Sequence, residues 1–361
     1  MKHKEYFSDS YEESRQKFLE ATKNYEIESI KIKENLYIDF ASPKKKTKEK
    51  LIIIISGTHG VETYLGSAAQ QIFLKEYQKK LKNTDVCLVH SLNPYGFKHD
   101  RRVNENNVDL NRNSVYDERL TLGIPNTKIS NIWTDSLLFI KLNRPRKHRF
   151  IEQLKYYALV LKSLRQDGLK NTINLSVKGQ STFPQSIAYK GVKLEDSLLH
   201  LRDFIEQKTK GYQEALLIDI HSGIGIKYEV LGFTNQEPKT KEYKLLKKIL
   251  RKTRSRKTIP VVEHMGSVSD LFLARSRAQT NMDITLEYGT IPKISSKLVF
   301  EYLGRLNIEE NQVFYFGTEK QKQKTRKKYR KAYAPKDVVF KKSLIRKTRK
   351  LYDKIIKVYD K

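Results

Sequence analysis

The fold class of this chain is set by the run Leu51-Ile-Ile-Ile-Ile55 and by the segment Ser56-Gly57-Thr58-His59-Gly60-Val61-Glu62 that follows it. Five consecutive apolar residues, four of them β-branched, are typical of a short strand buried on both faces, as in a parallel sheet. Apolar residues at three- and four-residue steps predict a helix over residues 63–82, and residues 85–90 predict a second strand. A strand, a helix and a strand in this order are the repeating unit of α/β proteins.

The same pattern returns later in the chain. Residues 215–221 and 282–287 are again short apolar runs that end in a turn signal, and the amphipathic stretch 196–207 predicts a helix before the first of them. Strands separated by helices predict a doubly wound α/β fold. In such a fold, ligands bind beyond the carboxyl ends of the strands, so candidate functional residues are sought there.

Composition excludes several classes of protein. The 361 residues include 71 Lys plus Arg against 41 Asp plus Glu, a net charge of +30, while the 38% of apolar residues suffices for a core. The single cysteine, Cys87, excludes an internal disulfide framework and a cysteine-rich zinc module. The chain contains neither the roughly 18-residue apolar run of a membrane-spanning helix nor a secretory signal, so we expect a cytoplasmic protein without a transmembrane segment.

Side chains that bind metal ions follow the predicted strands. His59 and Glu62 come three residues apart after the first run, and His221 ends the strand 215–221. A set of two histidines and one glutamate leaves a fourth position of a zinc ion open for water, as in catalytic sites; the alternative for the first two is an exposed loop pair. Asp219 lies on the same face of its strand as His221 and is expected either to orient that imidazole or to cap a backbone donor.

Two further features add chemistry to these strand ends. Glu287 closes the run 282–287, where it could act on a water molecule as a general base and then as a general acid. The loop 98–113 contains three arginines and, before Asn113, four asparagines. Guanidinium groups beside amides can bind a carboxylate in a bidentate manner and stabilise an oxyanion.

In combination, His59-x-x-Glu62, Asp109-Leu-Asn-Arg112-Asn113, His221 and Glu287 resemble the zinc carboxypeptidases of the carboxypeptidase A type and the related succinylglutamate desuccinylases and aspartoacylases. The strongest likeness is to a bacterial, metallopeptidase-like branch of that superfamily with unknown function. The motifs of that branch occur here at residues 56–62, 93–97, 101–113, 179–180 and 287–290. The resemblance implies a mostly parallel, mixed sheet flanked by helices and one zinc ion per chain.

The resemblance also implies roles for individual residues. His59, Glu62 and His221 would be the zinc ligands, and Glu287 would be the general base.

The remaining roles concern the substrate. Asn111 and Arg112 would bind its free carboxylate, and Arg102, with the adjacent Arg101 as the alternative, would polarise the scissile carbonyl. Gln180 belongs to a substrate-binding segment in which this chain departs from the pattern of the branch, so the choice of substrate stays open.

We therefore predict a single catalytic domain over residues 1–316, with its motifs in about 50–295, and a basic helical extension over 317–361. The predicted activity is zinc-dependent hydrolysis of an amide bond next to a free carboxylate, in a peptide or in an acylated amino acid. In the extension, 18 Lys plus Arg face 4 Asp plus Glu, and a second basic helix is expected over 243–257. A third interpretation is therefore a protein that binds nucleic acid or an anionic membrane and retains a vestigial metal site. The sequence does not determine the oligomeric state.

Overall fold

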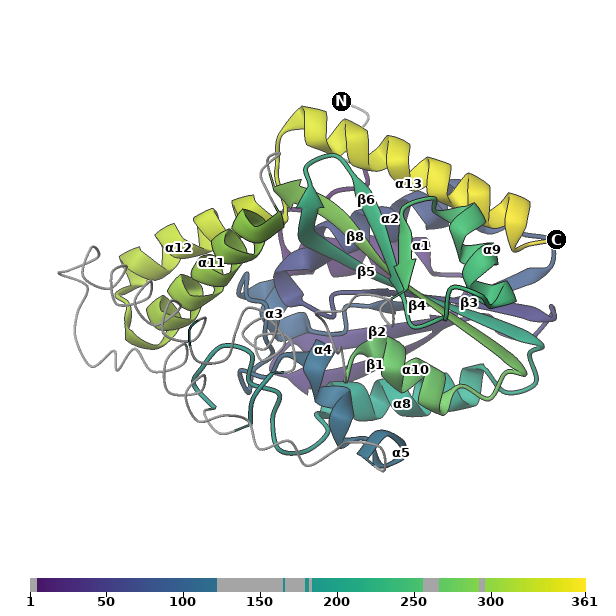
Figure 1. Ribbon diagram of the computed structural model, residues 1–361, viewed down its shortest axis with the longest axis horizontal. Helices are drawn as coiled ribbons and strands as arrows, with labels where there is room; N and C mark the ends of the chain where they lie inside the picture. The colour runs from purple at the N-terminus through teal and green to yellow at the C-terminus, as the bar shows by residue number, and fades with distance from the viewer. Residues whose placement is uncertain (1–4, 122–164, 166–178, 182–183, 256–265, 292–295) are drawn as a thin grey trace.

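The computed structural model describes residues 5–121, 165, 179–181, 184–255, 266–291 and 296–361. Within these residues, eight strands form one mixed sheet with the order β1-β2-β4-β3-β5-β8-β6-β7 (Figure 1). The strands are β1 (Glu26–Lys33), β2 (Leu36–Ser42), β3 (Lys50–Ser56), β4 (Thr84–His90), β5 (Glu214–Ile226), β6 (Val230–Thr234), β7 (Thr253–Ser255) and β8 (Thr280–Ile291).

The centre of the sheet is parallel. Strands β4, β3, β5 and β8 run in the same direction, whereas β2 joins β4, and β6 joins β8, in antiparallel register. Strand β3 is buried on both faces: Ile52 and Ile54 belong to one apolar cluster, and Leu51, Ile53 and Ile55 belong to the other. This arrangement confirms the predicted doubly wound α/β fold with a mostly parallel, mixed sheet.

Helices cover both faces of the sheet (Figure 1). One face packs against α1 (Tyr11–Ala21), α2 (Thr63–Glu76), α9 (Lys241–Ile249) and α13 (Val338–Val358), and the other against α8 (Asp196–Lys208) and α10 (Val268–Arg275). The chain also contains three short helices, α3 (Pro94–Lys98), α4 (Leu110–Asn113) and α5 (Glu118–Thr121). Two longer ones are α11 (Ser296–Phe316) and α12 (Glu319–Tyr333).

Four predicted elements end differently in the structure. Helix α2 ends at Glu76 rather than at residue 82, because the lysines that follow offer no apolar face and the Tyr77 ring turns into the core beside Tyr352. The basic helix expected over 243–257 spans only 241–249. The chain then enters strand β7, and residues 256–257 lie outside the described part. Strands β5 and β8 both run several residues past their predicted ends.

The basic C-terminal segment folds as two helices. Helix α12 packs against α11 as a hairpin, whereas α13 crosses α2 and α9 and contributes Leu344, Leu351 and Ile355 to the main core. At its end, the Tyr359 hydroxyl donates a hydrogen bond of 3.1 Å to the carbonyl of Leu51 in β3. Among the described residues, no helix is both long enough and apolar enough to cross a membrane.

Candidate metal centre

The candidate site lies at the carboxyl ends of β3 and β5, where the winding of the sheet reverses. From β3 the chain passes through α2 to β4 on one side, and β5 joins β3 on the other. In doubly wound sheets this switch point is where ligands bind. The turn after β3 needs its glycines: Gly57 has φ +81°, and a Cβ atom at Gly60 would collide with the backbone of Gly96.

Three buried side chains converge at this point. The Nδ1 atom of His59 lies 3.0 Å from Oε1 of Glu62, and the Nδ1 atom of His221 lies 3.1 Å from Oε2 of Glu62. The two Nδ1 atoms are 3.1 Å apart. All three residues are at most 3% exposed. The structure therefore brings together the three residues that the sequence predicts as metal ligands.

Each imidazole turns its other nitrogen to an aspartate. Nε2 of His221 lies 2.6 Å from Asp219, whose second oxygen accepts a hydrogen bond from the Thr58 hydroxyl. Nε2 of His59 lies 3.2 Å from Asp109. When each Nε2 carries the proton for its aspartate, both Nδ1 atoms are unprotonated and direct their lone pairs toward each other and toward a carboxylate.

This donor set fits a zinc ion. Imidazole nitrogens and carboxylate oxygens are zinc ligands at about 2.0–2.2 Å, so two ligands of a tetrahedral ion lie roughly 3.3 Å apart. The observed separations of 3.0–3.1 Å are somewhat shorter than this spacing, so a small outward shift of the three side chains would admit the ion. Carboxylate partners on the second nitrogen of each histidine are the usual support of such ligands. His59, Glu62 and His221 are thus positioned as possible metal ligands.

The electrostatics of the cluster favour positive charge at its centre. Burial alone would lower the pKa of His221, but the Asp219 and Glu62 carboxylates raise it to about 10. Burial opposes the ionised form of Glu62, yet the two imidazoles hold its pKa far below the usual range. A field that stabilises a proton here stabilises a metal cation as well.

Glu287 stands beside this cluster on strand β8. It is paired in register with His221 of β5, and its side chain is only 8% exposed. One carboxylate oxygen, Oε2, is buried without a hydrogen-bond partner among the described residues. Burial, followed by the charge of Glu62, raises the pKa of Glu287 to about 8. A carboxyl group with these properties is suited to exchange protons near neutral pH.

The two adjacent arginines have different surroundings. The Arg102 guanidinium donates to Asp109 at 3.0 Å and lies 3.5 Å from Glu62, so it borders the metal cluster. Arg101 points elsewhere: it is 1% exposed and bonds Glu310 and Asn311 of α11 at 2.8 and 3.0 Å. Among the described residues, the Arg102 guanidinium thus contacts the candidate site, whereas the Arg101 guanidinium bonds Glu310, Asn311 and Asn107.

The predicted substrate-binding residues lie next to one another. Asn111 accepts a hydrogen bond from the backbone of Val268, and Arg112 donates to the backbone carbonyl of Asn111 at 2.6 Å. A Cβ atom on Gly179 would lie 3.4 Å from the Arg112 side chain, which places the Gly179-Gln180 segment against Arg112. Gln180 is buried and forms a β-bridge with Tyr189.

Several contributors to the site have no role in the prediction from sequence. Asp109 both orients His59 and caps α4, and the Ser222 backbone N–H donates to Glu62 at 2.9 Å. Asp109 begins the motif that contains Asn111 and Arg112, the two residues assigned to the substrate carboxylate. Its position in that motif was the signal that could have identified it as part of the site. Helix α12 packs over the strand end, because the Ser222 hydroxyl donates to the Tyr333 carbonyl and Gly223 faces the Tyr333 ring. No local pattern points to that contact.

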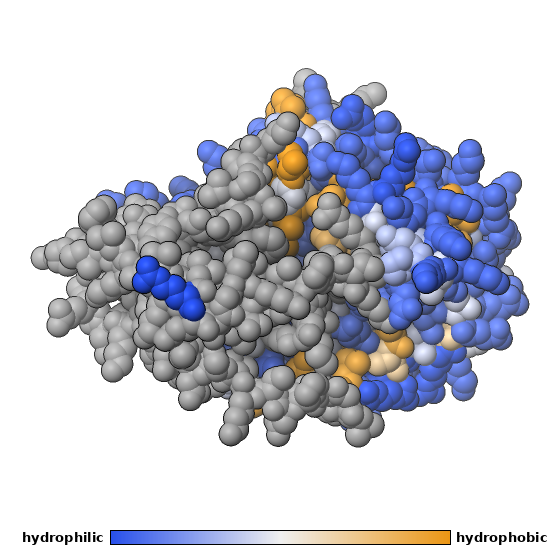
Figure 2. Space-filling view, in the orientation of Figure 1, coloured by the Kyte–Doolittle hydropathy of each residue, from blue (hydrophilic) through white to orange (hydrophobic). Residues whose placement is uncertain are grey.

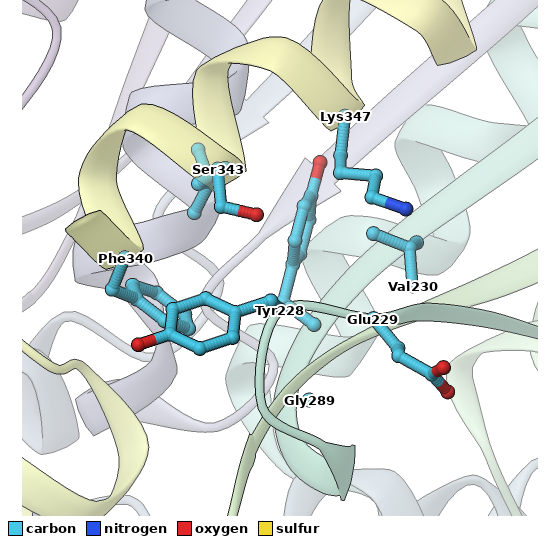
Figure 3. Close-up of a pocket in the computed structure, with 9 residues that line it drawn as sticks. Tyr228, Glu229, Val230, Gly289, Phe340, Ser343 and Lys347 are labelled. Atoms are coloured by element: carbon cyan, nitrogen blue, oxygen red, sulfur yellow. The ribbon is translucent and has the colours of Figure 1, made fainter.

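A small cavity lies away from the metal cluster, between α13 and the turn that joins β5 to β6 (Figure 3). Tyr228, Phe340, Ser343 and Lys347 are among its lining residues. None of the predicted site residues lines it.

Several solved structures resemble the chain at low identity. Carboxypeptidase A from Helicoverpa armigera is 14% identical, with a TM-score of 0.45, and the match covers 90% of this chain and 74% of that one. Bovine thrombin-activatable fibrinolysis inhibitor is 14% identical, with a TM-score of 0.46 and coverage of 90% and 99%. Murein-tripeptide amidase MpaA from Escherichia coli O157 is 15% identical, with a TM-score of 0.38 and coverage of 83% and 89%. With these TM-scores below 0.5, none of the three likenesses assigns a role to a residue.

A search of the curated proteins finds no relative of this chain. One family model, described as "Protein of unknown function (DUF2817)", matches residues 7–347, which is nearly the whole sequence. The match agrees with the resemblance to a branch of unknown function that the motifs indicate. The chain therefore belongs to the DUF2817 family.

Proposed function

We propose that this protein is a zinc-dependent hydrolase that cleaves an amide bond next to a free carboxylate. The observation that carries the proposal is the cluster of two imidazole Nδ1 atoms and one carboxylate, in which both Nε2 atoms are already engaged by aspartates. Two imidazole nitrogens that face each other beside a buried carboxylate need a cation between them, which can be a proton or a metal ion, and the three side chains present are of the types that bind zinc.

In this proposal, His59, Glu62 and His221 hold the zinc ion, which supplies a Lewis acid and lowers the pKa of water. Asp219 and Asp109 keep the imidazoles in the tautomer that presents Nδ1. Glu287, with its unpartnered Oε2 atom, takes a proton from the attacking water and returns it to the leaving nitrogen.

The substrate is held by the arginine-rich loop. Arg102 is 21% exposed at its side chain, and it is the group that stabilises negative charge on the carbonyl oxygen. Asn111 and Arg112 bind the free carboxylate next to the scissile bond, with Gln180 beside them. The proposal includes both a peptide carboxyl terminus and an acylated amino acid as the substrate, with hydrolysis of the latter as the alternative activity.

The first test is the metal content of the purified protein, measured by elemental analysis. We expect about one zinc ion per chain in the wild type and a loss of that zinc in the double variant His59→Ala/His221→Ala. His200→Ala is the matched control. His200 is exposed and lies in α8, which packs on the face of the sheet opposite α2. Circular dichroism of all three proteins checks that the fold is retained.

Activity is then measured on two substrate sets: peptides with a free or an amidated carboxyl terminus, and amino acids with or without an N-acyl group. Hydrolysis that requires both zinc and the free carboxylate supports the proposal, and the set that is cleaved identifies the class of substrate. A wild-type protein that binds no zinc, even after zinc is added, would refute it.

A further inference from the structure

Exposed apolar side chains gather at the start of α13. Val338 and Val339, in the first turn of the helix, are 58% and 64% exposed. Ile226 and Tyr228, at the end of β5 and in the turn after it, are 36% and 39% exposed. We call these four residues the apolar tip. They make up most of the exposed large apolar side chains among the described residues; the others are Val192 and Phe316.

The members of the apolar tip form one surface. Lys227 of the turn pairs with Asp337, the residue before α13, at 3.0 Å. The ring of Tyr228 lies 6.1 Å from that of Phe340 in the first turn of α13, and Figure 3 shows the two rings side by side. In Figure 2, orange side chains lie at the top of the molecule, where Figure 1 places the start of α13, with blue side chains around them.

The exposed face of α13 continues the apolar tip as a row of cations. Five exposed basic residues follow one another along the helix and form no ion pair with another described residue: Lys342, Arg346, Lys350, Lys354 and Lys357. Helix α9 packs beside α13 and adds exposed Lys244, Lys247 and Lys248. Within α13 the only acidic residue is Asp353, and the acidic residues at its two ends are engaged elsewhere: Asp337 pairs with Lys227, and Asp360 accepts from the backbone of Lys82 and Asn83.

Further cations lie beside the start of α13. Lys341 lies over the ring of Phe7; burial lowers its pKa, the charge of Asp9 opposes this shift, and Lys336 and Arg330 add to it. An excess of positive charge on a surface attracts an anionic partner.

Two observations favour a membrane over nucleic acid as that partner. Aliphatic side chains that protrude beside lysines are typical of protein surfaces that enter the headgroup region of a bilayer. The tyrosines among the basic residues of α12 and α13 are buried and cannot stack on bases: Tyr329, Tyr333 and Tyr352 are at most 2% exposed. A single-strand binding surface stacks successive bases on several exposed aromatic rings, whereas the apolar tip offers the single ring of Tyr228.

We propose that the start of α13 and the adjoining turn dock on the surface of an anionic membrane. The apolar tip enters the headgroup region, and the cations of α13 and α9 contact the anionic lipids. The docking surface and the metal centre share no residue, so the proposal does not depend on the proposed hydrolase activity.

The test is sedimentation of the full chain with vesicles of phosphatidylcholine that contain either 30% phosphatidylglycerol or none, at about 0.15 M salt. Val338→Ser/Val339→Ser removes the aliphatic groups without changing the charge, and serine is well tolerated in a first helical turn. Its matched control is Val192→Ser, an exposed valine that precedes α8 on the opposite face. Lys342→Gln/Arg346→Gln reduces the charge of the row, and Lys193→Gln/Lys210→Gln is its control, with two exposed lysines that flank α8.

We expect the wild type to bind the anionic vesicles at least tenfold more tightly than the neutral ones. The valine pair and the cation pair should each weaken this binding about tenfold, and the two controls less than twofold. Equal binding to both vesicle types overturns the proposal, as does equal loss in variants and controls. Tight binding of a 30-nucleotide single strand that exceeds vesicle binding and persists in the valine variant would assign the surface to nucleic acid instead.

Discussion

Two aspartates decide what the histidines of the candidate site can bind. Asp219 and Asp109 each face the Nε2 atom of one imidazole, so the Nδ1 atoms turn inward to Glu62. Glu287 then completes the site with a carboxylate oxygen that no described residue satisfies. The arrangement is specific because each of these carboxylates is positioned by a different part of the chain: Asp109 caps α4, Asp219 lies in β5 and Glu287 lies in β8.

Substitution of the adjacent arginines should separate stability from activity. Arg101→Gln leaves buried Glu310 without its cation, and we expect it to lower the free energy of unfolding by about 3–5 kcal/mol. Arg102→Gln should leave the fold intact and reduce kcat roughly 10²–10³-fold, the typical cost of a lost oxyanion donor. Urea unfolding and steady-state kinetics measure the two effects. An active, unstable Arg102 variant and a stable, inactive Arg101 variant would reverse the assignment.

This pair also shows how far the sequence specifies the site. His59, Glu62, His221 and Glu287 could be predicted together, because each lies at or just after the end of an apolar run, and these runs are neighbouring parallel strands. The sequence could not choose between Arg101 and Arg102. That choice depends on Glu310 and Asn311, which lie more than 200 residues away in α11. Contacts of this range leave no periodic pattern in the sequence.

A buried histidine outside the site should make stability depend on pH. His90 is fully buried and stacks on Phe18, and burial lowers its pKa from 6.5 to about 4. The unfolded chain therefore binds a proton at this residue that the folded chain rejects. Protonation of His90 in the unfolded chain therefore lowers the free energy of unfolding as the pH falls below 6.5. The loss reaches about 3 kcal/mol near pH 4, whereas above pH 6.5 this residue causes no loss.

The comparison that isolates this effect is between the wild type and His90→Gln, which keeps a polar side chain but does not titrate. Between pH 7 and 4, the free energy of unfolding measured with urea should fall more steeply in the wild type than in the variant. Parallel pH profiles for the two proteins would show that His90 is not held neutral by its surroundings.

At the scale of elements, the sequence predicted where helices and strands lie more accurately than where they end. The strands β3, β4, β5 and β8 and helix α8 appear where short apolar runs or helical spacing placed them. The ends differ because tertiary contacts decide them. Strand β8 continues to Ile291 because Gly289 lets the backbone of Ile226 come close. Helix α9 stops at Ile249 because the following residues pair with β6.

The sequence showed the helical spacing of the apolar residues in α13, but it did not show that the helix packs against α2 and α9. Six of its apolar side chains and that of Tyr359 are buried in the main core, including Leu351, Tyr352 and Ile355. Each fully buried side chain of this kind contributes roughly 1.5–3 kcal/mol, so their sum is comparable to the whole net stability of about 5–15 kcal/mol of typical proteins. Helix α13 is therefore a part of the core rather than a removable tail.

Removal of α13 should thus prevent folding. A chain that ends at residue 336 is expected to lack a cooperative unfolding transition, and Leu351→Ala in the full chain should cost about 2–5 kcal/mol. Lys350→Ala, at an exposed neighbouring position, is the control and should change stability by less than about 0.5 kcal/mol. Thermal unfolding followed by circular dichroism measures all three. A truncated chain with the midpoint of the wild type would show that the helix merely covers the surface.

At the scale of the whole molecule, positive charge predominates. The net charge is +30, and most ion pairs among the described residues have an exposed partner, such as Lys17 with Glu13 and Lys98 with Glu12. Pairs of this kind contribute about 0–1 kcal/mol each and weaken with salt. Repulsion between the remaining cations opposes the compact state, because folding brings them closer together than they are in the unfolded chain.

Salt should therefore stabilise this protein. Raising sodium chloride from 0.02 to 0.3 M shortens the screening length from about 20 Å to about 6 Å, which weakens repulsion between distant lysines more than attraction within close pairs. We expect the midpoint of thermal unfolding to rise by a few degrees. Sucrose at equal osmolality controls for solvent effects that do not involve charge. A midpoint that falls with salt would mean that the ion pairs, rather than the excess of cations, govern the electrostatic part of the stability.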